Sequence, residues 1–113
     1  MAWRLQLWAD LSVPALDRPI GAVWPTTYSG LKSDTAMGYR IVLPGGALWH
    51  TLQFMVDRQT RKPTNRRWAV TMPDGDPTRM TVAPSIDIFD GYHGFIRDGV
   101  ISDDVSGKKF KED

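Results

Sequence analysis

Chain-breaking residues are spread along almost the whole sequence. The 113 residues include eight prolines and ten glycines, and few stretches of ten residues lack both. Proline removes a backbone donor and glycine weakens a helix interior, so this spacing excludes long helices. Many short strands joined by tight turns fit the same spacing. We therefore expect a mainly β protein without a helix longer than about ten residues.

Between the breakers, apolar residues recur with the period of a strand. At the N-terminus Trp3, Leu5 and Leu7 alternate with other side chains, and Trp8 falls on the opposite face. Period-two alternation is typical of a half-buried strand. The other segments that we predict as strands are 21–24, 39–43, 48–56, 68–72, 79–83, 86–89, 92–96 and 100–102.

Turn signals separate these segments. Pro44-Gly45-Gly46 and the run P-D-G-D-P at residues 73–77 each lie between two predicted strands. Asp90-Gly91 and Asp98-Gly99 stand between alternating apolar residues, which is a strong hairpin signal because both residue types accept positive φ angles. We expect all of these sites to be tight turns between antiparallel strands.

The fold class follows from the short strands and the turns. We predict a small antiparallel sandwich or a partly open barrel, with about seven to nine strands arranged in short hairpins. Residues 25–38 are expected to form a loop with one helical turn at most, and residues 57–65 a polar loop. A chain of this length holds one core, so we predict a single β domain over 1–105 and a flexible charged tail over 106–113.

Composition narrows the function classes. The net charge is +1, so no global field attracts the protein to nucleic acid or to an anionic membrane. The absence of cysteine excludes disulfides and thiolate metal sites. The N-terminal segment lacks the continuous apolar run of a signal peptide, and no apolar run reaches the roughly 20 residues of a membrane helix. We expect no membrane partner.

The two Asp-Gly turns predict which side chains meet. If both are two-residue turns, Ile88 pairs with His93, Phe95 with Ser102, and His93 with Asp104. The alternation of the strands then defines two faces. One face carries Ile86, Ile88, His93, Phe95, Val100 and Asp104, and the other carries Asp87, Phe89, Tyr92, Ile96, Ile101 and Asp103.

The predicted neighbours His93 and Asp104 have two interpretations. A carboxylate beside an imidazole can orient it as a general base in catalysis. The pair can instead be a half-buried histidine that a cross-strand partner satisfies. No Ser, Cys or Lys nucleophile stands at a recognisable spacing from His93, so we favour the structural interpretation.

Basic residues gather in one loop. Five of the fourteen Lys and Arg residues fall within ten positions without an acid, namely Arg58, Arg61, Lys62, Arg66 and Arg67. Trp68 follows directly, and an aromatic ring beside cations is the arrangement that binds phosphates and stacks on a base. The alternative is a solvated loop between two strands. The low net charge argues against a dedicated nucleic-acid binder.

Five tryptophans are many for so small a core. Tryptophan is rarely fully buried and is enriched in binding hot spots. Trp8 and Trp68 are the candidates for an exposed partner-binding or ligand-binding surface. The alternative is that the tryptophans cover the edges of a small β core.

Several segments together resemble a group of short phage-encoded proteins of unassigned function. The resemblance rests on G-A-V-W at 21–24, L-P-G-G-A-L-W-H at 43–50, W-A-V at 68–70, P-S-I at 84–86 and Y-H-G-F-I-R-D-G-V-I-S-D-D at 92–104. It covers residues 21–107 and is most specific where P-S-I is followed by Y-H-G and the Asp-Gly turn. The resemblance implies no catalytic activity.

A more distant resemblance points to small phage and bacterial proteins with a C-P-x-C-G knuckle, some of them labelled ammonia monooxygenase. The cysteine positions of that knuckle hold Leu43 and Gly46 here, whereas His50 and His93 stand at its histidine positions. By this resemblance the two histidines and Asp104 are the remaining candidates for a metal site. We favour histidines retained for packing or hydrogen bonding, and expect no metal or other cofactor.

Three functional hypotheses result. We favour a non-enzymatic phage accessory protein of the host cytoplasm, with a counter-defence role, that binds a host, phage or defence protein or a nucleotide-like ligand at the basic loop. The second is a minor virion or assembly component that self-associates. The third is a metal-dependent hydrolase that uses His50, His93 and Asp104.

Overall fold

The protein is a small β-sandwich built from hairpins. The computed structural model describes residues 2–29 and 35–110, and in these residues it has eleven strands, three short 3-10 turns and no α-helix. The strands form separate sheets without a closed barrel, and all pairs but one are antiparallel. The predicted fold class is therefore confirmed. The strands are more numerous than predicted because several are only two or three residues long.

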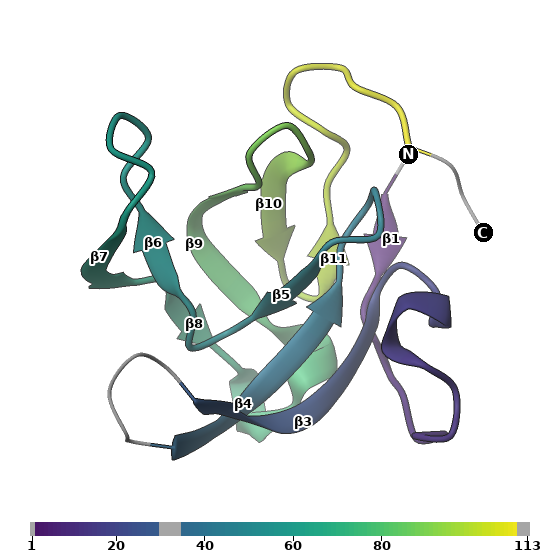
Figure 1. The fold of residues 1–113 in the computed structure, drawn as a ribbon. Coiled ribbons are helices and arrows are strands. Elements are labelled where there is room, and N and C mark those ends of the chain that lie inside the picture. The colour runs from purple at the N-terminus through teal and green to yellow at the C-terminus, as the bar shows by residue number, and fades with distance from the viewer. Residues whose placement is uncertain (1, 30–34, 111–113) are drawn as a thin grey trace.

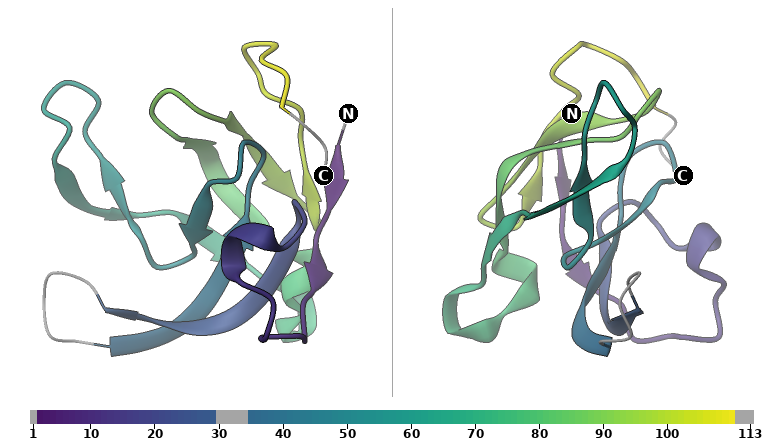
Figure 2. Two further views of the ribbon diagram at one scale, coloured as in Figure 1. Left: turned by 45° about the vertical axis from the view of Figure 1, so that its right-hand side comes forward. Right: turned by 60° about the vertical axis from the view of Figure 1, so that its left-hand side comes forward.

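The two layers of the sandwich are visible in Figure 1 and in the turned views of Figure 2. The larger sheet has the order β1–β11–β10–β9–β8, with β1 at Trp3–Arg4, β8 at Ala69–Thr71, β9 at Thr81–Asp87, β10 at His93–Arg97 and β11 at Val100–Ile101. The second sheet has the order β2–β3–β4–β5, with β2 at Gln6–Leu7, β3 at Ala22–Ser29, β4 at Thr35–Val42 and β5 at Leu48–His50.

A third, two-stranded sheet stands beside these layers. It consists of β6 (Phe54–Val56) and β7 (Pro63–Arg67), which are antiparallel. Segment 48–56, predicted as one strand, is thus divided, because the chain turns at 51–53 and β6 leaves to pair with β7. The predicted loop 57–65 is correspondingly shorter, since β7 begins within it. The 3-10 turns are η1 (Ala15–Asp17), η2 (Pro73–Gly75) and η3 (Pro77–Arg79).

The core lies between the two large sheets. Its buried side chains are Leu5, Val23, Ile41, Leu43, Trp49, Met80, Val82, Ile86, Tyr92, Ile96 and Ile101. Each large apolar side chain removed from water contributes about 1.5–3 kcal/mol. A smaller cluster of Ala22, Trp24 and Val42 forms separately and is covered in part by Trp8.

The N-terminal strand joins the two sheets along one side of the sandwich. β1 pairs with β11, and β2 pairs in parallel with β3. Leu5 lies between them and is 2% exposed, with its N–H bonded to the Gly99 carbonyl at 2.8 Å. The change of sheet interrupts the predicted alternation, so Leu7 is 59% exposed whereas Trp8 packs against the smaller cluster.

The prediction of a loop over residues 25–38 is wrong. In the described part of that range, β3 and β4 form a long hairpin in which Pro25 pairs with Tyr39 and Thr27 with Met37. Proline is tolerated there because β2 pairs only with Ala22 and Val23, so β3 is an edge strand beyond that point. Residues 30–34 lie outside the described residues.

The two Asp-Gly turns differ. The second is the predicted two-residue turn, since Arg97 pairs with Val100 and both Asp98 and Gly99 have positive φ angles. The prediction for the first turn, Asp90-Gly91, is wrong by one residue. His93 pairs with Asp87 and not with Ile88, because a three-residue loop over 89–91 connects the strands. A register shift of one residue moves every side chain of a strand to the opposite face of the sheet, relative to its partner strand.

The predicted faces are therefore mixed. Ile86 pairs with Gly94 and is buried with Ile96, whereas His93 and Phe95 belong to the half-buried outer face. Position 94 requires a glycine, because a Cβ there would lie 2.4 Å from the ring carbon Cζ of Tyr92.

The segment after β11 lies against the domain. Phe110 packs edge-on against Tyr92, with ring centroids 6.2 Å apart. A Cβ on Gly45, in the predicted turn between β4 and β5, would lie 2.9 Å from the Phe110 ring. Phe110 of the predicted tail is therefore in contact with that turn, and 111–113 lie outside the described residues.

Gly38 should tolerate no side chain. A Cβ at this position would lie 2.6 Å from Thr51 Oγ1 and 2.7 Å from His50 Cε1. We expect Gly38→Ala to lower the free energy of unfolding by about 1–3 kcal/mol, the usual cost of overpacking. Urea denaturation measures it. Met37→Ala, which changes a 65% exposed neighbour, is the control and should have a much smaller effect.

Candidate functional site

The predicted basic residues lie on one exposed hairpin. We use the name arginine hairpin for residues 54–67, which comprise β6, β7 and the loop between them. The Asp57 carboxylate orders the loop by accepting the N–H groups of Gln59 and Thr60, at 2.8 and 2.9 Å. These bonds, that of Thr60 above all, lower the pKa of the Asp57 carboxyl. Arg58, Arg61, Lys62, Arg66 and Arg67 are all exposed.

Two arginines of the hairpin are stacked on aromatic rings. The guanidinium of Arg67 lies 4.1 Å from the centroid of Phe54, and its Nε–H donates to the Leu52 carbonyl at 2.9 Å. The guanidinium of Arg61 lies 5.0 Å from the centroid of Phe89, in the β9–β10 loop. These contacts fix the position of both guanidiniums while leaving them at the surface.

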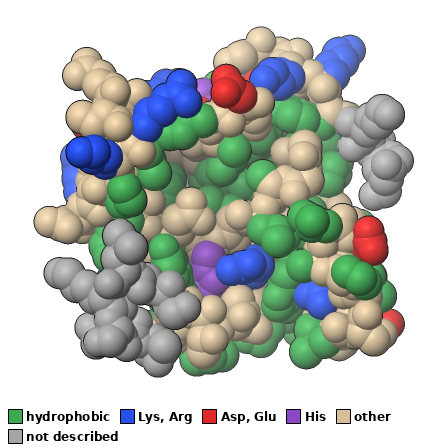
Figure 3. Space-filling model, in the orientation of Figure 1, with side chains coloured by type: hydrophobic (Ala, Val, Ile, Leu, Met, Phe, Trp, Pro, Cys, Tyr) green, Lys and Arg blue, Asp and Glu red, His purple; other side chains and the backbone are tan. Residues whose placement is uncertain are grey.

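Arg58 links the hairpin to the larger sheet. It forms an ion pair with Asp87 at the end of β9, with 3.0 Å between Nη1 and Oδ2. The side chains of Lys62 and Arg66 have no hydrogen-bond or ion-pair partner among the described residues. Figure 3 shows basic side chains along this part of the surface, beside a hollow with hydrophobic side chains in its floor.

Trp68 is held by the domain and is not a free stacking surface. Its ring packs edge-on against Trp49, with centroids 5.3 Å apart, and its Nε1–H donates to the Ser85 carbonyl at 3.1 Å. The rings next to the cations are instead Phe54 and Phe89. Sequence reasoning missed both, and Phe89 gives no sequence signal because it reaches Arg61 only through the fold.

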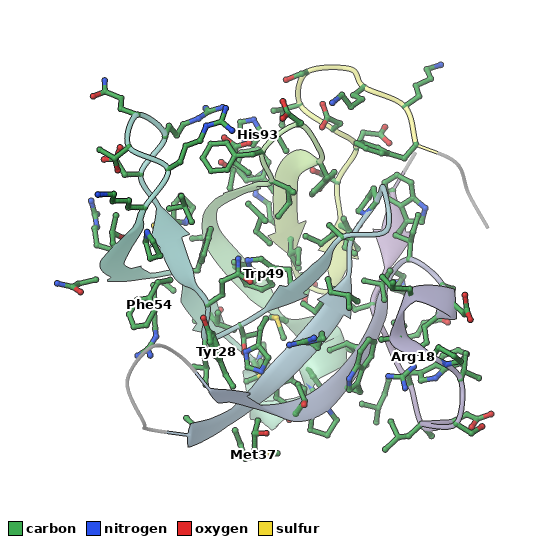
Figure 4. All side chains as sticks on the ribbon, in the orientation of Figure 1. Arg18, Tyr28, Met37, Trp49, Phe54 and His93 are labelled. Carbon is green, nitrogen blue, oxygen red and sulfur yellow. The ribbon has the colours of Figure 1, made fainter. Side chains whose placement is uncertain are left out.

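His93 and Asp104 do come together, but through the backbone. The Asp104 Oδ2 accepts the backbone N–H of His93 at 2.8 Å. The His93 ring instead lies by Ser85, with 3.1 Å between Nε2 and Oγ. Figure 4 labels His93 on β10, facing the side of the arginine hairpin. Sequence reasoning missed Ser85, because the assumed register placed the wrong face of β9 opposite His93.

The Asp104 carboxylate fixes the chain after β11. It is 7% exposed, and it also accepts the N–H groups of Ser106 and Lys108, at 2.8 and 3.3 Å. Burial alone would raise the pKa of this carboxyl, but the three N–H donors together bring it below its ordinary value. The Asp104 carboxylate therefore binds backbone N–H groups and makes no hydrogen bond to the His93 imidazole.

His50 lies in the other sheet, within the hairpin layer of β3, β4 and β5. Its Nε2 lies 3.1 Å from the Thr26 carbonyl, and its Nδ1 accepts the Leu52 N–H at 3.1 Å. A carbonyl accepts and an amide donates, so the ring is neutral with its proton on Nε2. Burial lowers the pKa of His50, and the positive charge of Arg40 adds to this.

The candidates for a metal site are therefore not brought together. His50 and His93 belong to different sheets, and both ring nitrogens of His50 are occupied. In the part of the chain that the structure describes, no three His, Asp or Glu side chains are grouped as metal ligands.

Trp8 lies away from the arginine hairpin. It is half-buried against the cluster of Ala22, Trp24 and Val42, and its Nε1–H donates to the Asp10 carbonyl at 2.8 Å. Figure 1 shows the N-terminal loop on the opposite side of the domain from β6 and β7. The two predicted tryptophans thus belong to different surfaces.

The neutral state of His50 predicts a pH dependence of stability. The unfolded chain regains the ordinary pKa of 6.5 and so binds more protons than the folded chain below that pH. Stability should be fully present above pH 6.5 and should decrease as the pH falls through 6.5 toward the lower pKa of the folded protein. Urea unfolding at a series of pH values tests this. A His50→Gln variant with the same pH dependence as wild type would contradict it.

The three bonds of Asp104 predict a structural role. Asp104→Ala leaves the N–H groups of His93, Ser106 and Lys108 without their acceptor. We expect the free energy of unfolding to fall by about 1–3 kcal/mol. Chemical denaturation measures this, with Asp17→Ala at an exposed position as the control. An Asp104→Ala variant as stable as the control would show that water replaces these bonds without cost.

Compared with known proteins, the chain matches no family model, no curated protein and no solved structure. Within residues 2–29 and 35–110, no helix has the length and apolar character needed to cross a membrane. The function must therefore be argued from the arrangement of side chains described above.

Proposed function

We propose that the protein is a non-enzymatic binding protein whose arginine hairpin takes a small phosphate-bearing, nucleotide-like ligand. The observation that carries the proposal is the stacking of two surface guanidiniums, that of Arg61 on Phe89 and that of Arg67 on Phe54. Both arginines were expected to contact phosphates, and the stacking gives them a fixed orientation for doing so.

A stacked guanidinium suits phosphate recognition. While one face lies on a ring, the N–H groups at its edge are free to form two parallel bonds with phosphate oxygens. An arginine that is already ordered loses less side-chain entropy when a ligand binds. The ring and the bond of Arg67 to the Leu52 carbonyl provide that order.

The neighbouring charges support an anionic ligand. Lys62 and Arg66 add two exposed cations to the same hairpin, and Arg58 is 72% exposed at its side chain although it contacts Asp87. Because the guanidinium side of this ion pair is well solvated, the pair contributes little in water, and Arg58 is available to a competing phosphate. Clustered cations give a positive local potential even when the net charge is only +1.

The biological setting of the proposal comes from the resemblance to phage proteins. A phage accessory protein in the host cytoplasm can act on the host or on its defences by sequestering a nucleotide-like ligand, or by binding a host, phage or defence protein. The size of the hairpin and the low net charge favour a short ligand over a long nucleic acid.

A second candidate function, a subunit of a virion or an assembly, has its own support. Among the residues that the structure describes, five large hydrophobic side chains are more than half exposed: Leu7, Leu11, Leu16, Met37 and Val105. In addition, β5 and β8 are terminal strands of their sheets. Apolar surface and terminal strands are features by which copies associate.

Loss of both stacked arginines should weaken ligand binding strongly. We expect Arg61→Ala combined with Arg67→Ala to weaken binding of a fluorescent ADP analogue at least tenfold, because each charge-assisted bond is worth about 1.5–3 kcal/mol. Arg67→Lys keeps the charge without the planar fork and should give an intermediate loss. Fluorescence anisotropy at a fixed salt concentration measures the dissociation constants.

Arg97 is the matched control. Its guanidinium lies 4.2 Å from the centroid of Phe95 on β10, so it is also a stacked arginine, but it is not part of the hairpin. Arg97→Ala should bind the analogue as wild type does. If Arg97→Ala lost as much affinity as the hairpin variant, the loss would reflect total charge and not the hairpin. If the wild type did not bind the analogue, the proposal would be overturned.

A further inference from the structure

The loop after the first strands carries an unusual concentration of exposed leucine. We use the name leucine loop for residues 7–17, which run from the last residue of β2 through η1 and contain Leu7, Leu11 and Leu16, with exposed fractions of 59%, 67% and 72%. Single exposed leucines are normal on a protein surface, but these eleven residues hold three of the five exposed large hydrophobic side chains in the described part of the chain.

The leucine loop is held in one conformation by Arg18. This arginine is only 8% exposed, and its guanidinium lies 4.2 Å from the centroid of a Trp24 ring. It donates to the carbonyl of Val13 at 2.9 Å and to that of Leu11 at 3.4 Å. The leucines are thus presented on an ordered backbone, which lowers the entropy lost on association.

Asp10 orders the other end of the loop. Its carboxylate accepts the backbone N–H and the hydroxyl of Ser12, at 3.1 and 2.5 Å, and its carbonyl accepts the Trp8 indole. The hydroxyl bond of Ser12 lowers the pKa of the Asp10 carboxyl, so this residue is a fixed negative charge beside the leucines.

Charge is divided between two sides of the molecule. The leucine loop contains Asp10 and Asp17 and no Lys or Arg. The arginine hairpin contains five basic residues and one acid, Asp57. Figure 4 labels Arg18, next to the leucine loop, and Phe54, in the arginine hairpin, on opposite sides of the domain.

We infer that the partner of the leucine loop is a second copy of this chain, which receives it against the arginine hairpin. The leucines then meet the hollow with a hydrophobic floor beside the hairpin (Figure 3), and the aspartates meet the arginines. Two leucine loops facing each other would instead bring like charges together, which disfavours a symmetric dimer. The contact is head-to-tail, and such contacts close into rings or extend as filaments.

This inference does not depend on the proposed ligand, although both use the arginine hairpin. Leucine-loop variants should lose association and keep nucleotide binding, because the loop is remote from the hairpin. A phosphate-bearing ligand should compete with the second copy for the same guanidiniums. The two proposals can therefore fail separately.

The first test is the mass of the protein in solution as a function of concentration. Wild type should exceed the monomer mass of 12.7 kDa in light scattering at low salt, and it should return to that mass at high salt. The variant L11D/L16D should remain a monomer under all conditions. Met37→Asp, at a 65% exposed apolar residue outside both surfaces, should associate as wild type does.

The second test mixes two variants that are each defective on one surface. L11D/L16D retains the hairpin, and R61E/R67E retains the loop, so each should be monomeric alone. Their mixture should form a one-to-one dimer and nothing larger, since only one contact per pair remains. Circular dichroism of each variant establishes that it is folded.

Three results would overturn the inference. Wild type that stays monomeric at every concentration would exclude the contact. Association of R61E/R67E alone would show that the leucine loops meet each other or another surface. A mixture that remains monomeric, with both variants folded, would show that the loop and the hairpin are not complementary.

Discussion

The sandwich depends on how its two sheets are joined at their sides. On one side the chain itself joins the sheets. It passes from β1 in the larger sheet through Leu5 to β2 in the second sheet, and both strands are hydrogen-bonded to their neighbours. Away from that joint, tryptophans from the two halves meet, with Trp49 of β5 against Trp68 just before β8. Side-chain packing there takes the place of backbone pairing, which is why the sheets do not close into a barrel. The arginine hairpin emerges between these two tryptophans in the sequence, so its base is anchored in the core.

Local sequence signals predicted the fold class well. The spacing of proline and glycine indicated short strands, and the Asp98-Gly99 turn was correct to the residue because both positions adopt positive φ angles. The errors arose where the secondary structure or the strand register depends on a residue far away in the sequence. Pro25 suggested a loop, and only the short reach of β2 explains how β3 continues past it as a strand. The loop before His93 has one residue more than an Asp-Gly turn needs, and that residue determines which face of β9 is buried.

The candidate site was predictable in part. Its cations could be identified because they are close together in the sequence. The aromatic and acidic side chains that contact these cations could not be identified in this way. Phe89 and Asp87 lie more than twenty residues after the arginines that they contact. Likewise, the proximity of His93 to Asp104 was correctly expected, but the bond between them uses the backbone N–H, which a side-chain pattern cannot reveal. The distant resemblance pointed to two histidine positions that the fold places in different sheets.

Pro25 has a consequence for how the protein avoids aggregation. Beyond Val23 no strand of the described residues pairs with the outer edge of β3, and a long, regular edge of this kind is a template for uncontrolled strand addition. Proline interrupts the row of N–H donors at the point where that edge begins. The β3 edge of the longest described hairpin is thereby a poorer template for backbone pairing with other chains. The other terminal strands of the described sheets are short: β1 and β2 have two residues each, β5, β6 and β8 have three, and β7 has five.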